Sequence, residues 1–321
     1  MTTSTEDAKI LHESRKKMYD QAEQYRNSFL DKKTGLINHK YLEKRVCPVC
    51  ESTESREIFK KNGGTYVICE KCEMVFLNPV FKDDELVLYY QCNNSNQALA
   101  HNSEVDFYRR IYTSGLDLIC NHKSSGDLLD IGCSSGLFLD VSAEKFRAHG
   151  IELNKSEIEI ARAKGHIVWD KPIEIVDFEG KDKFDVITLW DVFEHIKDGI
   201  TYLSNLKSKV RSGGVVFLQI PSADSLAARI MREKCNMFDG LEHVNLYSRT
   251  TIRKAAEKAG YKVLGMVSVI DELKPLLNYL SYEDPYYGQF RDVSGVDFIS
   301  KDLIFSNMLG YKLQVLLSPV S

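Results

Sequence analysis

A strand, a turn of small residues and a helix are predicted in succession between Leu128 and Asp140. The apolar run at 128–131 has the length of a buried strand, and from Leu137 onward apolar residues recur at helical spacing. The turn, 132–136, contains only small residues, so its backbone N–H groups can approach a ligand closely, and Ser134 or Ser135 can cap the helix. This pattern predicts a nucleotide-binding α/β domain.

Strands and helices continue to alternate as far as residue 266. The first helix is predicted to run from Leu137 to His149, and the next strand to cover 151–153. Further buried strands are predicted at 184–190, 215–220 and 261–266, with helices at 156–164, 202–209 and 248–259. This alternation predicts a doubly wound, Rossmann-like α/β sheet. Glu152 follows Asp130 by 22 positions, the separation at which nucleotide folds place an acid on ribose hydroxyls.

Two Cys-x-x-Cys pairs, Cys47 with Cys50 and Cys69 with Cys72, precede this domain, with 18 residues between them. Each pair can present two thiolates from one tight turn, so two pairs at this separation can hold one tetrahedral Zn²⁺. A hairpin with a turn at Gly63-Gly64 is predicted between them, which indicates a zinc ribbon. Four thiolates leave no open position on the metal, so the zinc would be structural. The alternative, a pair of redox motifs, lacks the βαβ context that such motifs have.

Composition limits the partners of the chain. The net charge of −4 gives no footprint for nucleic acid, and the stretch between the cysteine pairs mixes acidic with basic residues. No apolar run is long enough for a transmembrane segment, and the N-terminal residues lack the apolar core of a signal peptide. Because thiolate ligands suit a reducing compartment, we expect a cytoplasmic protein; peripheral attachment to a membrane stays open.

The glycine spacing argues against a dinucleotide. Such a site needs G-x-G-x-x-G, whereas Gly132 and Gly136 have no third glycine after them, which disfavours a nicotinamide-dependent oxidoreductase. The stretch instead resembles motif I of class I S-adenosylmethionine-dependent methyltransferases, D-x-G-x-G-x-G, with Ser134 in place of the middle glycine. Residues 184–195, FDVITLWDVFEH, are similar to the fourth strand of that family and its exit loop. Ser212-Gly213-Gly214, followed by a strand that ends at Pro221, resembles a later turn of the same family.

The resemblance implies S-adenosylmethionine as cofactor. A zinc module ahead of such a domain is similar to the one in methyltransferases of sugar and surface-polysaccharide metabolism, including sugar C-methyltransferases. We accordingly divide the chain into a helical arm at 1–45, a zinc-ribbon module at 46–95, a methyltransferase domain at 96–270 and a C-terminal extension at 271–321. The residues expected around the cofactor are Asp130, Gly132, Cys133, Ser134, Gly136, Glu152, Trp190 and Asp191. Trp190 could equally be a core residue, and Asp130 is expected to brace the turn.

Methyl transfer to carbon or oxygen of a small, sugar-linked substrate requires a group that accepts a proton, and histidine titrates near neutrality. By the resemblance, His243 is the expected general base, assisted by Glu242, with His195 also lining the substrate pocket. Each histidine also has a purely structural interpretation, His195 as a helix cap or brace and His243 as a hydrogen-bonding residue.

A second function remains open beside the enzyme. The zinc ribbon could belong to a binding protein that recognises or modifies nucleic acid or protein through a methyltransferase-like scaffold. The arm at 1–45 either packs on its own chain or forms a homodimer. No chemistry is assigned to the extension at 271–321, which could shape the substrate pocket, cover a dimer surface or complete the core.

Overall fold

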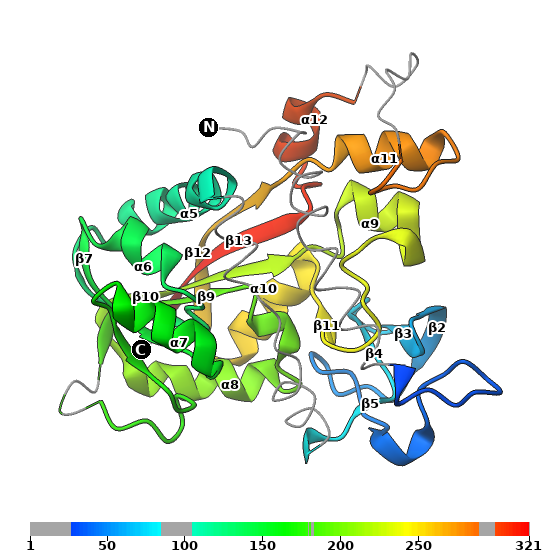
Figure 1. Cartoon of the computed structure of the whole chain (residues 1–321), viewed down its shortest axis with the longest axis horizontal. Helices are drawn as coiled ribbons and strands as arrows, with labels where there is room; N and C mark the ends of the chain where they lie inside the picture. The colour runs from blue at the N-terminus through cyan, green and yellow to red at the C-terminus, as the bar shows by residue number, and fades with distance from the viewer. Residues whose placement is uncertain (1–26, 85–104, 179, 181–182, 289–298, 321) are drawn as a thin grey trace.

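The computed structural model describes residues 27–84, 105–178, 180, 183–288 and 299–320 of the chain (Figure 1). Most of the arm predicted at 1–45 lies outside these residues, as does the end of the module predicted at 46–95. Among the described residues, no helix is both long enough and apolar enough to cross a membrane.

A seven-stranded sheet forms the centre of the molecule, in the order β12-β13-β10-β9-β6-β7-β8. Its strands are β6 (Gly126–Ile131), β7 (Phe146–Ile151), β8 (Ile167–Trp169), β9 (Phe184–Trp190), β10 (Val210–Pro221), β12 (Tyr261–Val269) and β13 (Lys312–Pro319). Strands β6 to β10 run parallel, whereas β13 is antiparallel to both of its neighbours. The predicted Rossmann-like α/β fold is therefore confirmed.

Helices cover both faces of this sheet. They are α5 (Val105–Cys120), α6 (Leu137–Ser142), α7 (Lys155–Ala163), α8 (Gly199–Leu206), α9 (Leu226–Met231), α10 (Arg249–Lys258), α11 (Leu273–Leu280) and α12 (Lys301–Ser306). Side chains of α5, α6 and α9 share one apolar cluster with Leu128 and Phe217, and those of α8 and α10 share another with Leu129 and Leu218. Neighbouring residues of one strand thus point to opposite faces, and both are apolar because helices bury both faces of the sheet.

The first helix after β6 is shorter than predicted. It ends at Ser142, and β7 begins at Phe146, where a continuous helix to His149 was expected. The residues of β7 pair with β6 in register, from Gly126 opposite Phe146 to Ile131 opposite Ile151. A short apolar run fits helical and strand spacing equally well, so this boundary depends on the pairing with β6.

The C-terminal residues complete the central sheet. Strand β13 lies between β10 and β12 and pairs over its length with both, so the segment predicted as an extension at 271–321 contributes an interior strand. Of the roles considered for this segment, completing the core is the one that the fold shows.

A second sheet has the order β11-β4-β3-β2, and of the four cysteines in the two pairs Cys69 alone lies in one of its strands. Strands β2 (Ser55–Lys61), β3 (Gly64–Cys69) and β4 (Val75–Leu77) come from the cysteine-containing stretch, but β11 (Asn245–Leu246) comes from a much later part of the chain. The predicted hairpin is β2-β3, although its turn is Asn62-Gly63, both with positive φ, one residue earlier than expected. Figure 1 shows this sheet beside the central domain. A two-stranded sheet, β1 (Leu42–Glu43) with β5 (Val80–Phe81), adjoins it in sequence.

Candidate active site

The turn after β6 has a backbone that favours glycine. Gly132, Ser134 and Gly136 have φ values of 77°, 47° and 80°, in the left-handed region. A Cβ atom on Gly132 would lie 2.6 Å from Cγ2 of Val192, so a side chain there would collide with the exit of β9. The predicted serine cap is wrong, because Gly136 occupies the N-cap position and the Ser134 hydroxyl donates instead to Glu157 Oε2 at 2.9 Å.

Glu152 follows the end of β7, the strand next to β6, and its carboxylate is already hydrogen-bonded to the turn. One carboxylate oxygen accepts from the backbone N–H of Ser134 at 2.9 Å. The other accepts from the N–H groups of Leu153 and Asn154 at 2.7 and 2.9 Å. The structure thus brings Glu152 together with the turn, and its contact with ribose hydroxyls stays a prediction.

Two predicted cofactor residues have buried side chains near this turn. Asp130 accepts a hydrogen bond from the Thr188 hydroxyl at 2.7 Å, which links β6 to β9, and burial raises its pKa to about 8. The Cys133 side chain packs in an apolar cluster with Leu139 and Ile158. Cys133 can therefore meet a ligand in the turn only through its backbone.

The end of β9 contributes Trp190 and Asp191. The Trp190 ring lies against the rings of Tyr112, Phe138 and Phe217, with centroid separations of 4.6 to 4.9 Å, so the core interpretation fits its side chain. Asp191 has a φ of 54° and accepts from Gln219 Nε2 at 3.3 Å, and it forms an ion pair with Lys312 of β13. Sequence analysis missed Lys312 because it lies in the C-terminal segment.

Glu194, His195 and His243 form a cluster beyond β9, in which Glu194 is buried and both histidines are half-buried. Glu194 and His195 belong to the short helix η2 (Phe193–His195), and His243 lies in the loop before β11. The two imidazole rings are 5.0 Å apart between centroids, and Nε2 of His243 is 4.0 Å from a carboxylate oxygen of Glu194. Neither Glu194 oxygen has a hydrogen-bond partner among the described residues. The ligand atoms of these three residues lie within 4.8 Å of one another, a spacing that could hold a metal ion but is too long for a direct hydrogen bond between Glu194 and His243.

Burial and charge set the protonation of this cluster. Burial, with the charge of Asp191, raises the pKa of Glu194 to about 8. Burial and the neighbouring His243 lower the pKa of His195 to about 4. Burial also lowers the pKa of His243, but the charges of Asp239 and Glu194 outweigh it, so this pKa is raised above its usual value. These shifts favour a proton on Glu194 or His243 over one on His195.

Asp239 organises the loop that carries His243. Its carboxylate accepts hydrogen bonds from the backbone N–H groups of Leu241, Glu242 and His243 at 2.7 to 3.3 Å. It also lies 3.6 Å from Nδ1 of His243, which is hydrogen-bonded to the backbone carbonyl of Met237 at 2.7 Å. Asp239 and Glu194 therefore act more strongly on His243 than Glu242, whose charge raises the pKa of His243 least among these carboxylates.

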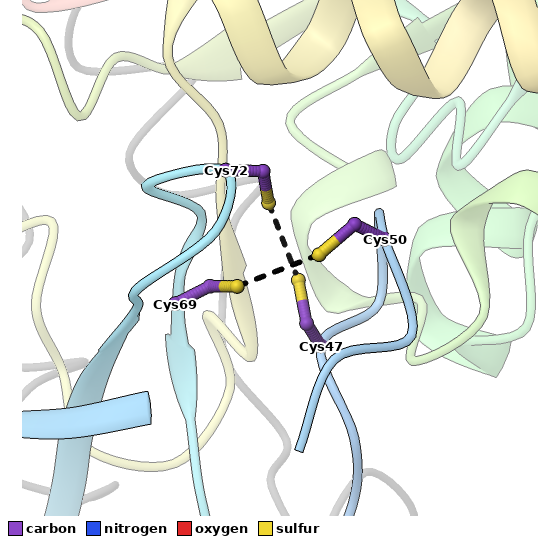
Figure 2. A group of neighbouring side chains, drawn as sticks. All are labelled: Cys47, Cys50, Cys69 and Cys72. Carbon is purple, nitrogen blue, oxygen red and sulfur yellow. Dashed lines mark hydrogen bonds between the residues drawn. The ribbon is translucent and has the colours of Figure 1, made fainter. Parts of the chain in front are cut away.

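Cys47, Cys50, Cys69 and Cys72, which lie in or near the strands of the second sheet in the sequence, converge on one point (Figure 2). The Sγ atoms of Cys47 and Cys72 are 3.5 Å apart, as are those of Cys50 and Cys69, and all four lie within 4.8 Å of one another. The edges of a tetrahedron around a zinc ion with Zn–S bonds of about 2.3 Å have a similar length. The four thiols thus have the spacing that a structural Zn²⁺ needs.

Comparison with known proteins identifies the family. The family model described as "Methyltransferase domain" matches residues 105–265, which are 161 of the 321 residues. The chain belongs to this family. The prediction of a methyltransferase is thereby confirmed at the level of the family.

Curated relatives and solved structures resemble parts of this methyltransferase. Ubiquinone biosynthesis O-methyltransferase of Histophilus somni is 27% identical over 101 residues, 28% of this chain and 42% of the relative. The enzyme of the same name from Mesorhizobium japonicum is 29% identical over 97 residues, covering 28% and 39%. The chain thus spans less than half the length of these relatives.

Among solved structures, an S-adenosylmethionine-dependent methyltransferase from Clostridium acetobutylicum has a TM-score of 0.44 at 14% identity, covering 66% of this chain and 92% of that one. One from Archaeoglobus fulgidus has a TM-score of 0.46 at 18% identity, covering 65% and 93%.

Three residues of this candidate site were not assigned roles from the sequence: Glu194, Asp239 and Lys312. Glu194 directly precedes His195, so an acid beside a histidine at a strand exit was an available signal. Asp239 becomes relevant only once the loop folds back on its carboxylate, and Lys312 only once β13 enters the sheet. The first depends on the shape of one loop and the second on a contact between distant segments, and the spacing of the sequence reveals neither.

Proposed function

We propose that this methyltransferase transfers the methyl group of S-adenosylmethionine to carbon or oxygen of a small, sugar-linked acceptor. The observation that carries the proposal is one edge of the central sheet. The turn after β6, Glu152 after β7, and the cluster of Glu194, His195 and His243 beyond β9 all lie at the carboxyl ends of parallel strands. Ligands of open α/β sheets bind at this edge.

The residues at this edge fit the cofactor. The glycines of the turn allow backbone to pass close to a ligand, and the Glu152 carboxylate can accept hydrogen bonds from two ribose hydroxyls. When bound, S-adenosylmethionine supplies a methyl group on a positively charged sulfur, a leaving group that needs no further activation. The four cysteines would hold Zn²⁺ away from the chemistry, as a structural metal.

His243 is the general base in this proposal. Bound S-adenosylmethionine would supply the methyl group to the nucleophilic carbon or oxygen of the acceptor, and its sulfur would keep the electron pair of the broken bond. The acceptor's proton passes to Nε2 of His243, since Nδ1 is already hydrogen-bonded to Met237. His195, uncharged near neutral pH, lines the same pocket.

Two lines of support bear on the acceptor. The sugar-linked class follows from the resemblance of the cysteine module and methyltransferase domain to sugar methyltransferases. The relatives are named ubiquinone biosynthesis O-methyltransferases, which supports oxygen as the methylated atom, although they match only 28% of this chain.

A methyl-transfer screen tests the proposal. With donor labelled in the methyl group, we expect label to move to at least one nucleotide-linked sugar or polysaccharide precursor, measured by mass spectrometry. A ubiquinone precursor and an RNA pool form separate arms of the same screen. Label on the ubiquinone precursor alone would disprove the sugar assignment and leave the methyltransferase activity standing, whereas label on RNA alone would support the function as a nucleic-acid modifier.

Glu194→Gln should shift the pH profile of transfer. The Glu194 charge raises the pKa of His243, so removing it lowers that pKa, and the neutral base persists at lower pH. We expect the acid limb of the kcat profile to move to lower pH, and kcat at high pH to fall because the base is weaker.

Glu242→Gln is the matched control for this measurement. The charge of Glu242 raises the pKa of His243 less than the charges of Asp239 and Glu194 do. The acid limb of the kcat profile should therefore move less in Glu242→Gln than in Glu194→Gln. Equal shifts for the two variants would show that Glu242 assists His243 as much as Glu194 does. An unchanged acid limb in Glu194→Gln would show that His243 is not the base that titrates in this profile.

A further inference from the structure

The loop that carries His243, residues 235–246, contacts the cysteine module, residues 45–78, at its start, its middle and its end. We call these segments the His243 loop and the module. At the start of the loop, Lys61 Nζ donates to the backbone carbonyl of Cys235 at 3.3 Å. At its end, β11 pairs with β4 of the module, Asn245 opposite Phe76 and Leu246 opposite Val75. The His243 loop thus ends as a strand of the module's own sheet.

Tyr66 of β3 links the module directly to His243. Its side chain is completely buried, and its hydroxyl donates to the backbone carbonyl of His243 at 3.3 Å. The same hydroxyl accepts from the backbone N–H of Gly240 at 3.1 Å. The ring lies edge-on to Phe238, with centroids 5.1 Å apart. One tyrosine therefore fixes the backbone on both sides of Glu242.

The β2-β3 turn of the module touches the loop through backbone. A Cβ atom on Gly240 would lie 2.1 Å from the carbonyl oxygen of Lys61, and one on Gly64 would lie 2.1 Å from the carbonyl oxygen of Gly240. Asn62 Nδ2 donates to the backbone carbonyl of Asp239 at 3.0 Å. Asp239 in turn binds the N–H of His243, so the turn holds the residue that orients the histidine.

Arg45 joins the cysteines to the end of the same loop. It stands two residues before Cys47. Its Nη2 donates to the Val244 carbonyl at 2.6 Å and to Asn245 Oδ1 at 2.8 Å, while Nε donates to the Leu77 carbonyl at 3.1 Å. This half-buried guanidinium therefore links three segments: β4, the residues before Cys47, and Val244 directly after His243.

We propose that the module positions His243 for methyl transfer and is not an independent recognition domain. The inference rests on the proposed function, because His243 acts as a general base only if the acceptor loses a proton. In this arrangement Tyr66 is a positioning residue: it touches neither cofactor nor acceptor and acts through the backbone of His243. A folded module keeps the His243 loop ordered, and Zn²⁺ on the four cysteines would stabilise that module.

Tyr66→Phe in the full-length chain tests this proposal. It removes the hydroxyl and keeps the ring packing against Phe238. We expect kcat to fall by about tenfold, the effect of one or two lost hydrogen bonds on the placement of a catalytic group. Affinity for S-adenosylhomocysteine should stay within twofold of the wild type, since the cofactor turn is untouched. Backbone amides of residues 238–247 should exchange hydrogen faster, a readout that does not depend on turnover.

Tyr261→Phe is the matched control. Tyr261 is also buried, and its hydroxyl donates to the Leu203 carbonyl at 2.9 Å, on the face of the sheet covered by α8 and α10. It should lose comparable stability with no change in kcat or in the exchange of residues 238–247. Equal behaviour of the two variants would overturn the proposal.

If Tyr66→Phe does not fold, Asn62→Gly supplies the test. Asn62 has a φ of 52°, which glycine adopts freely, so the variant removes only the side-chain amide that holds Asp239. Faster exchange in residues 238–247 supports the proposal, and unchanged exchange contradicts it. If the wild-type chain transfers no methyl group, the proposed function fails, but the exchange measurements still decide whether the module orders the loop.

Discussion

His243→Ala should lower kcat for methyl transfer by about 10²- to 10⁴-fold, the range found when a general base is removed. Nδ1 of His243 is hydrogen-bonded to the Met237 carbonyl, so Nε2 is the nitrogen left to accept the proton, and the alanine variant has no such nitrogen. The measurement is a single-turnover rate at saturating donor and acceptor. Affinity for S-adenosylmethionine should not change.

His122→Ala is the control for this prediction, because His122 is exposed at the end of α5 and far along the chain from the cluster. It should retain the wild-type rate. A full rate in His243→Ala would refute the base assignment while the cofactor assignment stands, and a large loss in His195→Ala alone would transfer the role to His195.

Cys69→Ser should abolish tight metal binding and lower the melting temperature by about 10 °C. Structural zinc in small modules contributes about 10–16 kcal/mol of apparent binding free energy, so losing one of four thiolates, taken as a quarter of it, removes about 2.5–4 kcal/mol. Each kcal/mol lowers the melting temperature of a domain of 150–250 residues by about 2–4 °C. The four sulfurs lie within 4.8 Å of one another and share a cluster with residues of the central sheet, so the loss affects more than the module. Elemental analysis should find one zinc per wild-type chain, and scanning calorimetry gives the melting temperature.

Cys120→Ala provides the comparison, because Cys120 is a half-buried thiol at the end of α5, outside the four-cysteine group. It should keep its zinc and melt within about 2 °C of the wild type. A wild-type chain that contains no zinc after expression with the metal, or a Cys69→Ser variant that retains one equivalent, would disprove the structural zinc.

Local patterns were enough to predict the parts of the site that lie close together in sequence. The strand-to-helix turn at 132–136 requires positive φ values, which its glycines adopt freely. The spacing to Glu152 reflects one strand-helix-strand crossover. The cysteine pairs predicted their own convergence because each pair forms a single tight turn. In each case the physical constraint acts within about twenty residues.

Contacts between distant segments could not be predicted in the same way. Strand β11 has only two residues, Asn245 and Leu246, so no periodicity marks it as an edge of the module's sheet. Strand β13 has an apolar run that fits a helix or a strand, and only its pairing with β10 and β12 decides between them. The serine cap failed for a related reason, because Glu157 of α7 offers the Ser134 hydroxyl a better acceptor.

A crystal structure with S-adenosylhomocysteine tests the central claim most directly. The account predicts both ribose hydroxyls within hydrogen-bond distance of the Glu152 carboxylate, the amino acid portion along the turn from Gly132 to Gly136, and the sulfur facing the His243 cluster. Nucleoside density anywhere else, or a turn whose approach is filled by the chain's own side chains, would contradict it.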